Sequence, residues 1–179
     1  ADPGNNAPVP ADLVTASALF DLCSADYIGR MARAVTSEGA AFYTVLTYDG
    51  QQSWSPAHPA DADMIAAFNE HQQIDKGFGS AAGPAAPAAL ALAFRQARYQ
   101  VVEASTPWLI GADERGLLEA LAGGFANAVA EIGRVPPGVV RQRFRAQILH
   151  DVAHDLIPRT IDDVLSSRGV EPVDTPDVK

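Results

Sequence analysis

The chain has 179 residues, of which 47% are hydrophobic, and a formal net charge of −9. So acidic a chain is unsuited to wrapping nucleic acid, because binding phosphates requires a basic face. Its apolar runs are far shorter than the roughly 20 residues that span a bilayer, and no basic-then-apolar signal segment opens the sequence. A single cysteine, Cys23, excludes an internal disulfide framework and a multi-thiolate zinc site. We therefore expect one domain of a soluble, cytoplasmic protein.

The first half of the chain alternates strand and helix signals. Residues 1–10 have turn and linker composition, and DLVTAS (residues 12–17) reads as a strand buried on both faces. Ser24 can cap a helix on which Ile28, Met31 and Val35 share one face. AAFYTVLTY (residues 40–48) is the strongest strand signal, because it is rich in aromatic and β-branched residues. It ends at a turn signal, Asp49-Gly50.

The second half predicts mostly helix around two short strands. In chain order we expect a helix capped by Asp61 or Asp63, an Ala/Leu helix over 87–97, strands over 99–104 and 107–111, a helix over 113–132 and a helix over 139–156. Leu117, Leu118, Leu121, Phe125 and Val129 form an apolar stripe, which we expect in the core. The two strands are most simply an antiparallel hairpin at one edge of the sheet.

Strands that alternate with helices predict an α/β sheet. The expected domain spans residues 11–157, preceded by the linker 1–10 and followed by a flexible C-terminal tail over 158–179. The expected sheet contains two parallel strands plus the antiparallel edge hairpin, and helices flank it.

Three strand segments in this order carry a resemblance: DLVTASALFDL, AAFYTVLTYDG and YQVVEASTPWLIG. Together with the helices between and after them, over residues 11–133, the chain resembles the C-terminal half of a class I S-adenosylmethionine-dependent methyltransferase. The resemblance implies a Rossmann-like methyltransferase fold in which these segments are strands four to seven. It also implies direct methyl transfer to an unidentified acceptor.

The family's glycine-rich cofactor loop belongs to a strand that comes earlier in the chain, and the sequence has no such loop before DLVTAS. The resemblance therefore implies half an enzyme, whose Asp12–Ser17 strand edge pairs with a missing half or a second chain. If that edge is unpaired, the half-enzyme interpretation loses its main physical support. The alternative function is a catalytically inactive methyltransferase-like module for binding or dimerisation.

Ligands of doubly wound sheets bind beyond the carboxyl ends of the parallel strands. By this rule the resemblance places Ser17, Ala18 and Asp21 against the cofactor, S-adenosylmethionine. Expected substrate contacts are Tyr48, Trp54, His71, Asp75 and Lys76. Aromatic side chains would hold an apolar acceptor and His71 could take a proton. The simpler interpretation is that the aromatic residues pack in the core and that His71 is solvated.

Two further motifs are weaker. GFGSAAG (residues 77–83) has the composition of a nucleotide loop, but a helix precedes it, whereas the nucleotide fingerprint follows a strand. A flexible loop or lid is the favoured interpretation. HDVAH (residues 150–154) has the two-histidine spacing of zinc sites, but Asp replaces the catalytic Glu and no obvious third ligand follows. We therefore expect no metal site. Cys23 is expected to be a small buried apolar residue.

Overall fold

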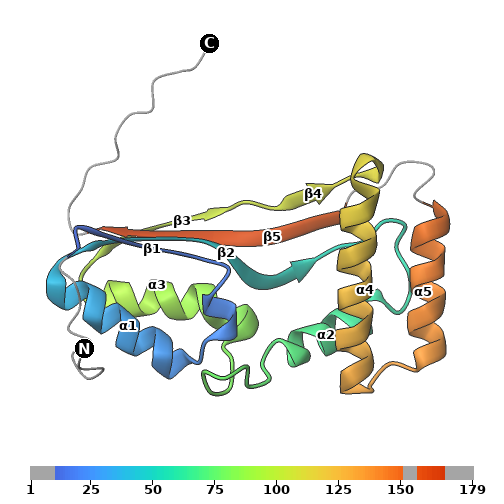
Figure 1. Cartoon of the computed structure of the whole chain (residues 1–179), viewed down its shortest axis with the longest axis horizontal. Coiled ribbons are helices and arrows are strands. Elements are labelled where there is room, and N and C mark those ends of the chain that lie inside the picture. The colour runs from blue at the N-terminus through green and yellow to red at the C-terminus, as the bar shows by residue number, and fades with distance from the viewer. Residues whose placement is uncertain (1–10, 151–156, 168–179) are drawn as a thin grey trace, which may run out of the picture.

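The computed structural model describes residues 11–150 and 157–167, which form one mixed sheet with helices packed against it (Figure 1). The helices and strands are, in chain order, β1 (Leu13–Ser17), α1 (Ala25–Glu38), β2 (Ala41–Gln52), α2 (Asp61–His71), α3 (Ala86–Gln96), β3 (Gln100–Ser105), β4 (Trp108–Ile110), α4 (Arg115–Ile132), α5 (Pro137–His150) and β5 (Ile157–Ser167). The expected α/β architecture is present. Assignment to a Rossmann-like fold stays a prediction, because one pair of parallel strands occurs in many α/β folds.

The strand order in the sheet is β1-β2-β5-β3, and β4 also pairs with β5. β1 and β2 are parallel, whereas β5 runs antiparallel to β2, β3 and β4. The predicted hairpin is therefore wrong: β3 and β4 lie end to end along β5 instead of pairing with each other. The physical reason is length, because the 11 residues of β5 offer enough backbone for both shorter strands.

The C-terminal part of the chain also differs from expectation. Residues 158–167, predicted to belong to a flexible tail, lie in β5, between β2 and β3. The last predicted helix is α5, described as far as His150. The rest of that predicted helix, residues 151–156, and of the predicted tail, residues 168–179, lie outside the described residues.

Local sequence signals account for α1 and its two ends. The Ser24 hydroxyl accepts a hydrogen bond from the Tyr27 N–H at 3.2 Å, which satisfies one of the free amides of the first turn. At the other end Gly39 takes a left-handed conformation, with φ of 71°, that favours glycine and stops the helix. The Ser24 cap confirms the predicted start of this helix.

β2 confirms the strongest strand signal but extends past it. Instead of a turn at Asp49-Gly50, the strand continues irregularly to Gln52, with register shifts in its pairing with β5. Gly50 has φ of 87°, and a Cβ there would come within 2.8 Å of the Pro84 Cβ. Glycine is therefore required, by conformation and by space, where β2 passes the start of α3.

β1 is the edge strand, and its exposure contradicts the prediction that both of its faces are buried. Leu13 is 54% exposed, whereas Val14 and Ala16 pack against the core beneath the sheet. Among the described residues no strand pairs with the outer edge of β1. The predicted pairing of this edge with a missing half or a second chain stays a prediction.

Two apolar cores hold the helices in place. The first lies between the sheet and the helices α1 and α3, where the Phe42 ring packs edge-on to Phe20 and is stacked on Phe94. The second joins α2, α4 and α5 around Trp54 and Phe125. Most of the predicted α4 stripe lies in this second core, but Leu117 is 42% exposed and does not.

Candidate functional site

The residues predicted to contact a cofactor do follow the end of β1. Ala18 has φ of 52°, and its N–H donates to the Val45 carbonyl at 3.2 Å, which continues the pairing of β1 with β2. Asp21 lies in a single 3-10 turn (Phe20–Leu22). Its Oδ1 is buried and has no hydrogen-bond partner among the described residues. Burial raises the pKa of the Asp21 carboxyl, while its own backbone N–H and the charge of Lys76 partly oppose the rise.

Three predicted substrate contacts lie at the end of α2 and in the loop after it. His71 Nε2 lies 3.0 Å from Glu131 Oε2 on α4. Lys76 donates to the His71 carbonyl at 3.3 Å. The Asp75 carboxylate accepts from the N–H groups of Gly77 and Gly79, at 2.7 and 3.1 Å. Each side chain therefore has a structural partner that fixes the loop.

Tyr48 and Trp54 lie in different surroundings. The Tyr48 hydroxyl donates to Asn69 Oδ1 on α2 at 2.7 Å, and Gln52 donates to the same hydroxyl at 2.9 Å. Trp54 instead packs in the second core, with its ring 5.1 Å from the ring of Phe125. Lys76 thus contacts the His71 backbone and its charge acts on Asp21, whereas Tyr48 is tied to α2 and Trp54 lies in the core.

The predicted site residues that follow the ends of β1 and β2 offer limited chemistry. The pKa of Asp49, near the end of β2, is also raised by burial. Cys23 is fully buried, and burial and the nearby Asp21 raise the pKa of its thiol, which makes it a poor nucleophile. Among the described residues no group of three His, Cys, Asp or Glu side chains could hold a metal ion.

The two weaker motifs gain no support. GFGSAAG runs from the bends after α2 to the start of α3, with Gly77, Gly79 and Gly83 at positive φ, and its hydrogen bonds hold a loop. His150 is the last residue of α5, and His154 lies outside the described residues. No helix in the described part of the chain is both long enough and apolar enough to cross a bilayer.

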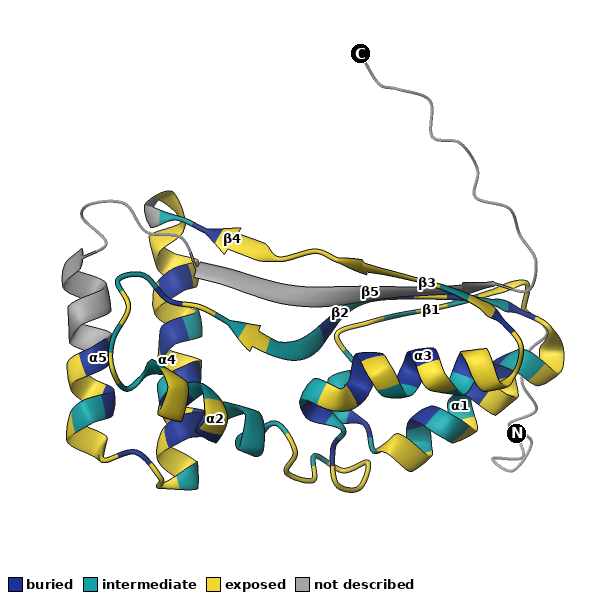
Figure 2. Cartoon of the chain, turned by 180° about the vertical axis from the view of Figure 1, so that it is seen from behind, coloured by how far each residue is buried: buried dark blue, intermediate teal, exposed yellow. Residues whose placement is uncertain are grey.

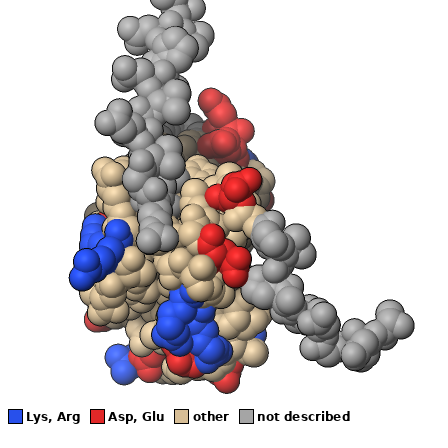
Figure 3. Space-filling view, turned by 90° about the vertical axis from the view of Figure 1, so that its left-hand side faces the viewer, with Lys and Arg blue, Asp and Glu red and all other residues tan. Residues whose placement is uncertain are grey.

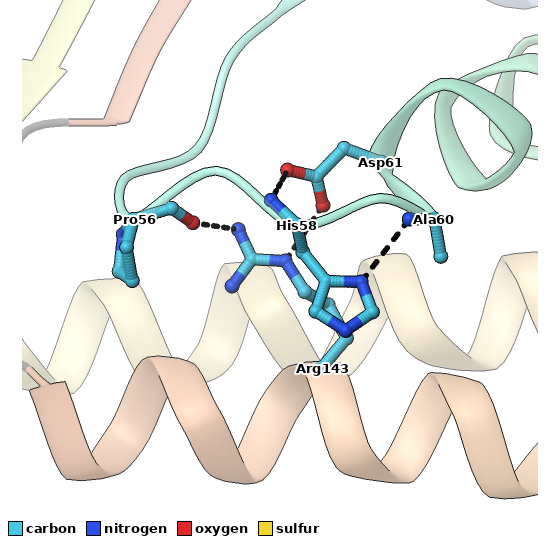
Figure 4. A network of polar contacts seen from close by, with 5 residues as sticks. All are labelled: Pro56, His58, Ala60, Asp61 and Arg143. Atoms are coloured by element: carbon cyan, nitrogen blue, oxygen red, sulfur yellow. Dashed lines mark hydrogen bonds and ion pairs between the residues drawn. The ribbon is translucent and has the colours of Figure 1, made fainter.

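Sequence reasoning missed a buried polar network that links α5 to the loop over residues 53–60, which we call the Trp54 loop (Figure 4). Arg143 Nε lies 2.6 Å from Asp61 Oδ1, and its Nη2 donates to the Pro56 carbonyl at 3.0 Å. The second Asp61 oxygen accepts from the His58 N–H at 2.8 Å. The network positions α2 against α5, and its members all have protein partners, so it is a structural element rather than a binding site.

The sheet itself presents the feature with the clearest capacity for binding. Helices α1 and α3 lie against one face, and along β1, β2 and β3 no described helix covers the other (Figure 1). We call this the open face and define it by its three exposed apolar residues, Leu13, Tyr43 and Val102, which are 54, 39 and 52% exposed.

The register of the strands confirms that these residues share one face. Thr15 pairs with Tyr43, Tyr43 with Leu165, and Leu165 with Val102, which forms a row across four strands. Directly paired residues point to the same side of a sheet. Their neighbours Val14, Phe42 and Val101 belong to the first core on the opposite side. Figure 2 shows the exposed residues continuing along β3 and β4.

Charged side chains do not dominate the end of the molecule at which β1 begins. Figure 3 shows Lys and Arg beside Asp and Glu there, with uncharged surface between them. The open face itself carries three exposed apolar side chains, Leu13, Tyr43 and Val102, and grouped exposed apolar side chains suit contact with a polypeptide.

Comparison with known protein families finds one match at the C-terminal end of the chain. Residues 131–179 match the family described as bacterial trigger factor protein. The described part of this segment includes α5 and β5, and β5 supplies one strand of the open face. No curated protein matches the chain.

This finding corrects the interpretation made from the sequence. The matched family is trigger factor and not a methyltransferase, so the assigned resemblance is wrong. Methyl transfer, the alternative of an inactive methyltransferase-like module, and S-adenosylmethionine as cofactor are wrong with it. The physical reason is that short strands alternating with amphipathic helices build many folds, and a fold does not specify a chemistry.

Proposed function

We propose that this chain has a chaperone-related role, in which the open face binds apolar segments of polypeptides that have not folded. Two observations support the proposal: the match of residues 131–179 to bacterial trigger factor, and the exposed apolar residues of the open face, Leu13, Tyr43 and Val102. The exposed residues carry more weight, because they are a property of this chain itself. We also propose that the chain acts in the cytoplasm, which agrees with the family matched.

The chemistry of the open face fits such a ligand. Unfolded chains expose apolar side chains that native proteins bury, and removing that area from water stabilises a complex by about 25 cal/mol per Å². Leu13 and Val102 offer aliphatic contacts, and Tyr43 between them offers a ring with a polar end. Three such side chains support weak, exchangeable binding, which suits a protein that must release its ligand.

The test is suppression of aggregation. A heat-denatured test protein would be followed by light scattering with the whole chain present. We expect the wild type to lower the scattering and a triple variant, Leu13→Thr, Tyr43→Thr and Val102→Thr, to lose most of that effect. Threonine keeps the β propensity of these positions while removing apolar surface.

The matched control carries the same change away from the sheet. Leu92 on α3 and Leu117 on α4 are 56 and 42% exposed, so Leu92→Thr with Leu117→Thr removes comparable apolar surface from the helices. This control should suppress aggregation as the wild type does. A wild type that does not lower the scattering, or a control that loses as much as the triple variant, would refute the proposal.

A further inference from the structure

Among the residues that the structure describes, nothing pairs with the outer edge of β1, which leaves a row of its backbone groups at the edge of the sheet. The Asp12 carbonyl accepts from the Ala41 N–H at 2.8 Å, and the Ala18 N–H donates to the Val45 carbonyl at 3.2 Å. In a parallel ladder the residues bonded to the neighbouring strand alternate along the chain. The even-numbered residues therefore face β2, and Leu13, Thr15 and Ser17 direct their N–H and C=O groups to the outer edge.

A small apolar pocket lies beside this edge. It has a volume of about 200 Å³ and is lined by Ala11, Val14, Met31, Ala34, Val35, Glu38 and Ala40. Four of these residues come from one face of α1, Val14 lies in β1, Ala11 precedes β1, and Ala40 directly precedes β2. The volume is below the range of about 300–1,000 Å³ typical of drug-sized ligands, so the pocket suits one or two side chains.

A free strand edge next to a side-chain pocket is the arrangement that binds extended peptides by strand addition. Main-chain hydrogen bonds supply affinity in that mode, and a pocket for alternate side chains supplies specificity. Building on the role proposed above, we infer that an extended polypeptide segment adds to the outer edge of β1 and places an aliphatic side chain in the pocket beside α1.

Charge favours a partner segment that carries a basic residue. Glu38 lies in the wall of the pocket, and Asp12 directly precedes β1. A second copy of this chain is the competing occupant, but each copy carries a net charge of −9, which opposes self-association. The occupant is therefore an extended segment with a Lys or Arg next to an aliphatic residue.

The probe is a blocked, fluorescein-labelled peptide of alternating Thr and Ile with one Lys, titrated with the whole chain and followed by anisotropy. The decisive comparison is the same peptide with alternate amides N-methylated along one edge, since this removes strand hydrogen bonds and keeps the side chains. We expect affinity to fall by about tenfold or more, as the loss of one or two hydrogen bonds predicts.

Three variants of the protein test the edge, the pocket and the charge. Thr15→Pro removes an outward N–H without removing a bond to β2, and proline is tolerated on edge strands. Ala34→Phe fills the pocket from an exposed position of α1. Both should weaken binding by about tenfold or more. Glu38→Gln should weaken binding of the Lys peptide a few-fold and leave a norleucine peptide unchanged.

The matched control is Ala66→Phe, the same change at an exposed position of α2 away from the pocket, which should bind as the wild type does.

Equal binding of the methylated and unmethylated peptides, or no binding to the wild type, would overturn the inference. So would a dimer that forms at the edge in sedimentation and disappears with Thr15→Pro. Aggregation suppression that persists without peptide binding would overturn the inference alone and leave the proposed function standing. Peptide binding by a wild type that does not suppress aggregation would overturn the proposed function alone and leave the inference about the β1 edge standing.

Discussion

Arg143 on α5 pairs with Asp61 at the start of α2, with a distance of 2.6 Å between Nε and Oδ1, although 82 residues separate them. Arg143 is 3% exposed, and it also holds the Pro56 carbonyl. α5 is thereby fixed to the Trp54 loop by polar contacts as well as by the apolar contacts of Val140. Because Arg143 belongs to the segment that matches trigger factor, the pair joins that segment to the rest of the chain.

Replacing Arg143 should therefore destabilise the protein strongly. In Arg143→Met the Asp61 carboxylate loses its buried partner, and removing one member of a buried pair costs about 3 kcal/mol or more. Urea denaturation would measure the free energy of unfolding. The double variant Arg143→Met with Asp61→Asn should recover part of the loss, because the unpaired charge is gone.

The control for this pair is Arg134→Ala. Arg134 Nε lies 2.8 Å from Glu70 Oε2, but both side chains are largely exposed. Exposed ion pairs contribute about 0–1 kcal/mol, so this variant should change stability little. Equal losses of unfolding free energy for Arg143→Met and Arg134→Ala would show that the buried Asp61 pair stabilises the protein no more than the exposed Glu70 pair does.

The alternation of faces along β2 gives a second prediction. Phe42 is fully buried between Phe20 and Phe94, whereas its neighbour Tyr43 lies on the open face. Phe42→Ala should lower the free energy of unfolding by about 3–5 kcal/mol through lost burial and the cavity left behind. Tyr43→Ala should lower the free energy of unfolding much less, because its side chain is partly exposed in the folded state. Thermal and urea melts of the two variants would check this, and similar losses would contradict the assignment of the two faces.

Local signals in the sequence predicted the elements that local physics builds. The Ser24 cap and the β-branched run of β2 act within a few residues, and both lie where expected. Long-range pairings could not be predicted in the same way. β5 lies between two strands that come at least 50 residues earlier, and its residues gave only a weak, polar pattern.

The candidate site was less predictable for a related reason. Asp21 does follow the end of β1, and the charge of Lys76 acts on it, but no finding tests these residues as a binding site. An apolar residue such as Val102 gives no sign in sequence of whether anything covers its side of the sheet. The open face therefore became visible only when the register and the positions of α1 and α3 were known.

Burial of Asp21 makes stability depend on pH. The pKa of its carboxyl is raised above the ordinary value of 3.8, so the folded state holds this proton more tightly than the unfolded state does. The resulting stabilisation is present below that value and is lost as pH rises through the folded-state pKa. Relative to the wild type, Asp21→Asn should therefore gain stability as pH rises above the ordinary carboxyl pKa of 3.8.

Lys76 supplies an internal check on that pH dependence. Its charge lowers the pKa of Asp21, so Lys76→Met should raise that pKa further and enlarge the loss of stability at neutral pH. In the Asp21→Asn background the part of the Lys76→Met effect that depends on pH should disappear. Urea denaturation across this pH range would measure both, and parallel curves for Asp21→Asn and the wild type would contradict the assignment.

The position of β5 gives the last prediction. β5 donates and accepts backbone hydrogen bonds on both edges, since Val164 pairs with Thr44 of β2 and with Glu103 of β3. Proline has no N–H and is excluded from the interior of a sheet, so Val164→Pro should break the ladder and unfold the sheet or lower its melting temperature sharply. Thr15→Pro, on the outer edge of β1, should leave the melting temperature nearly unchanged. Circular dichroism melts of both variants would separate the two positions. If the two prolines cost the same, β5 would not be the strand that joins β2 to β3, and without it the open face would lose its continuity.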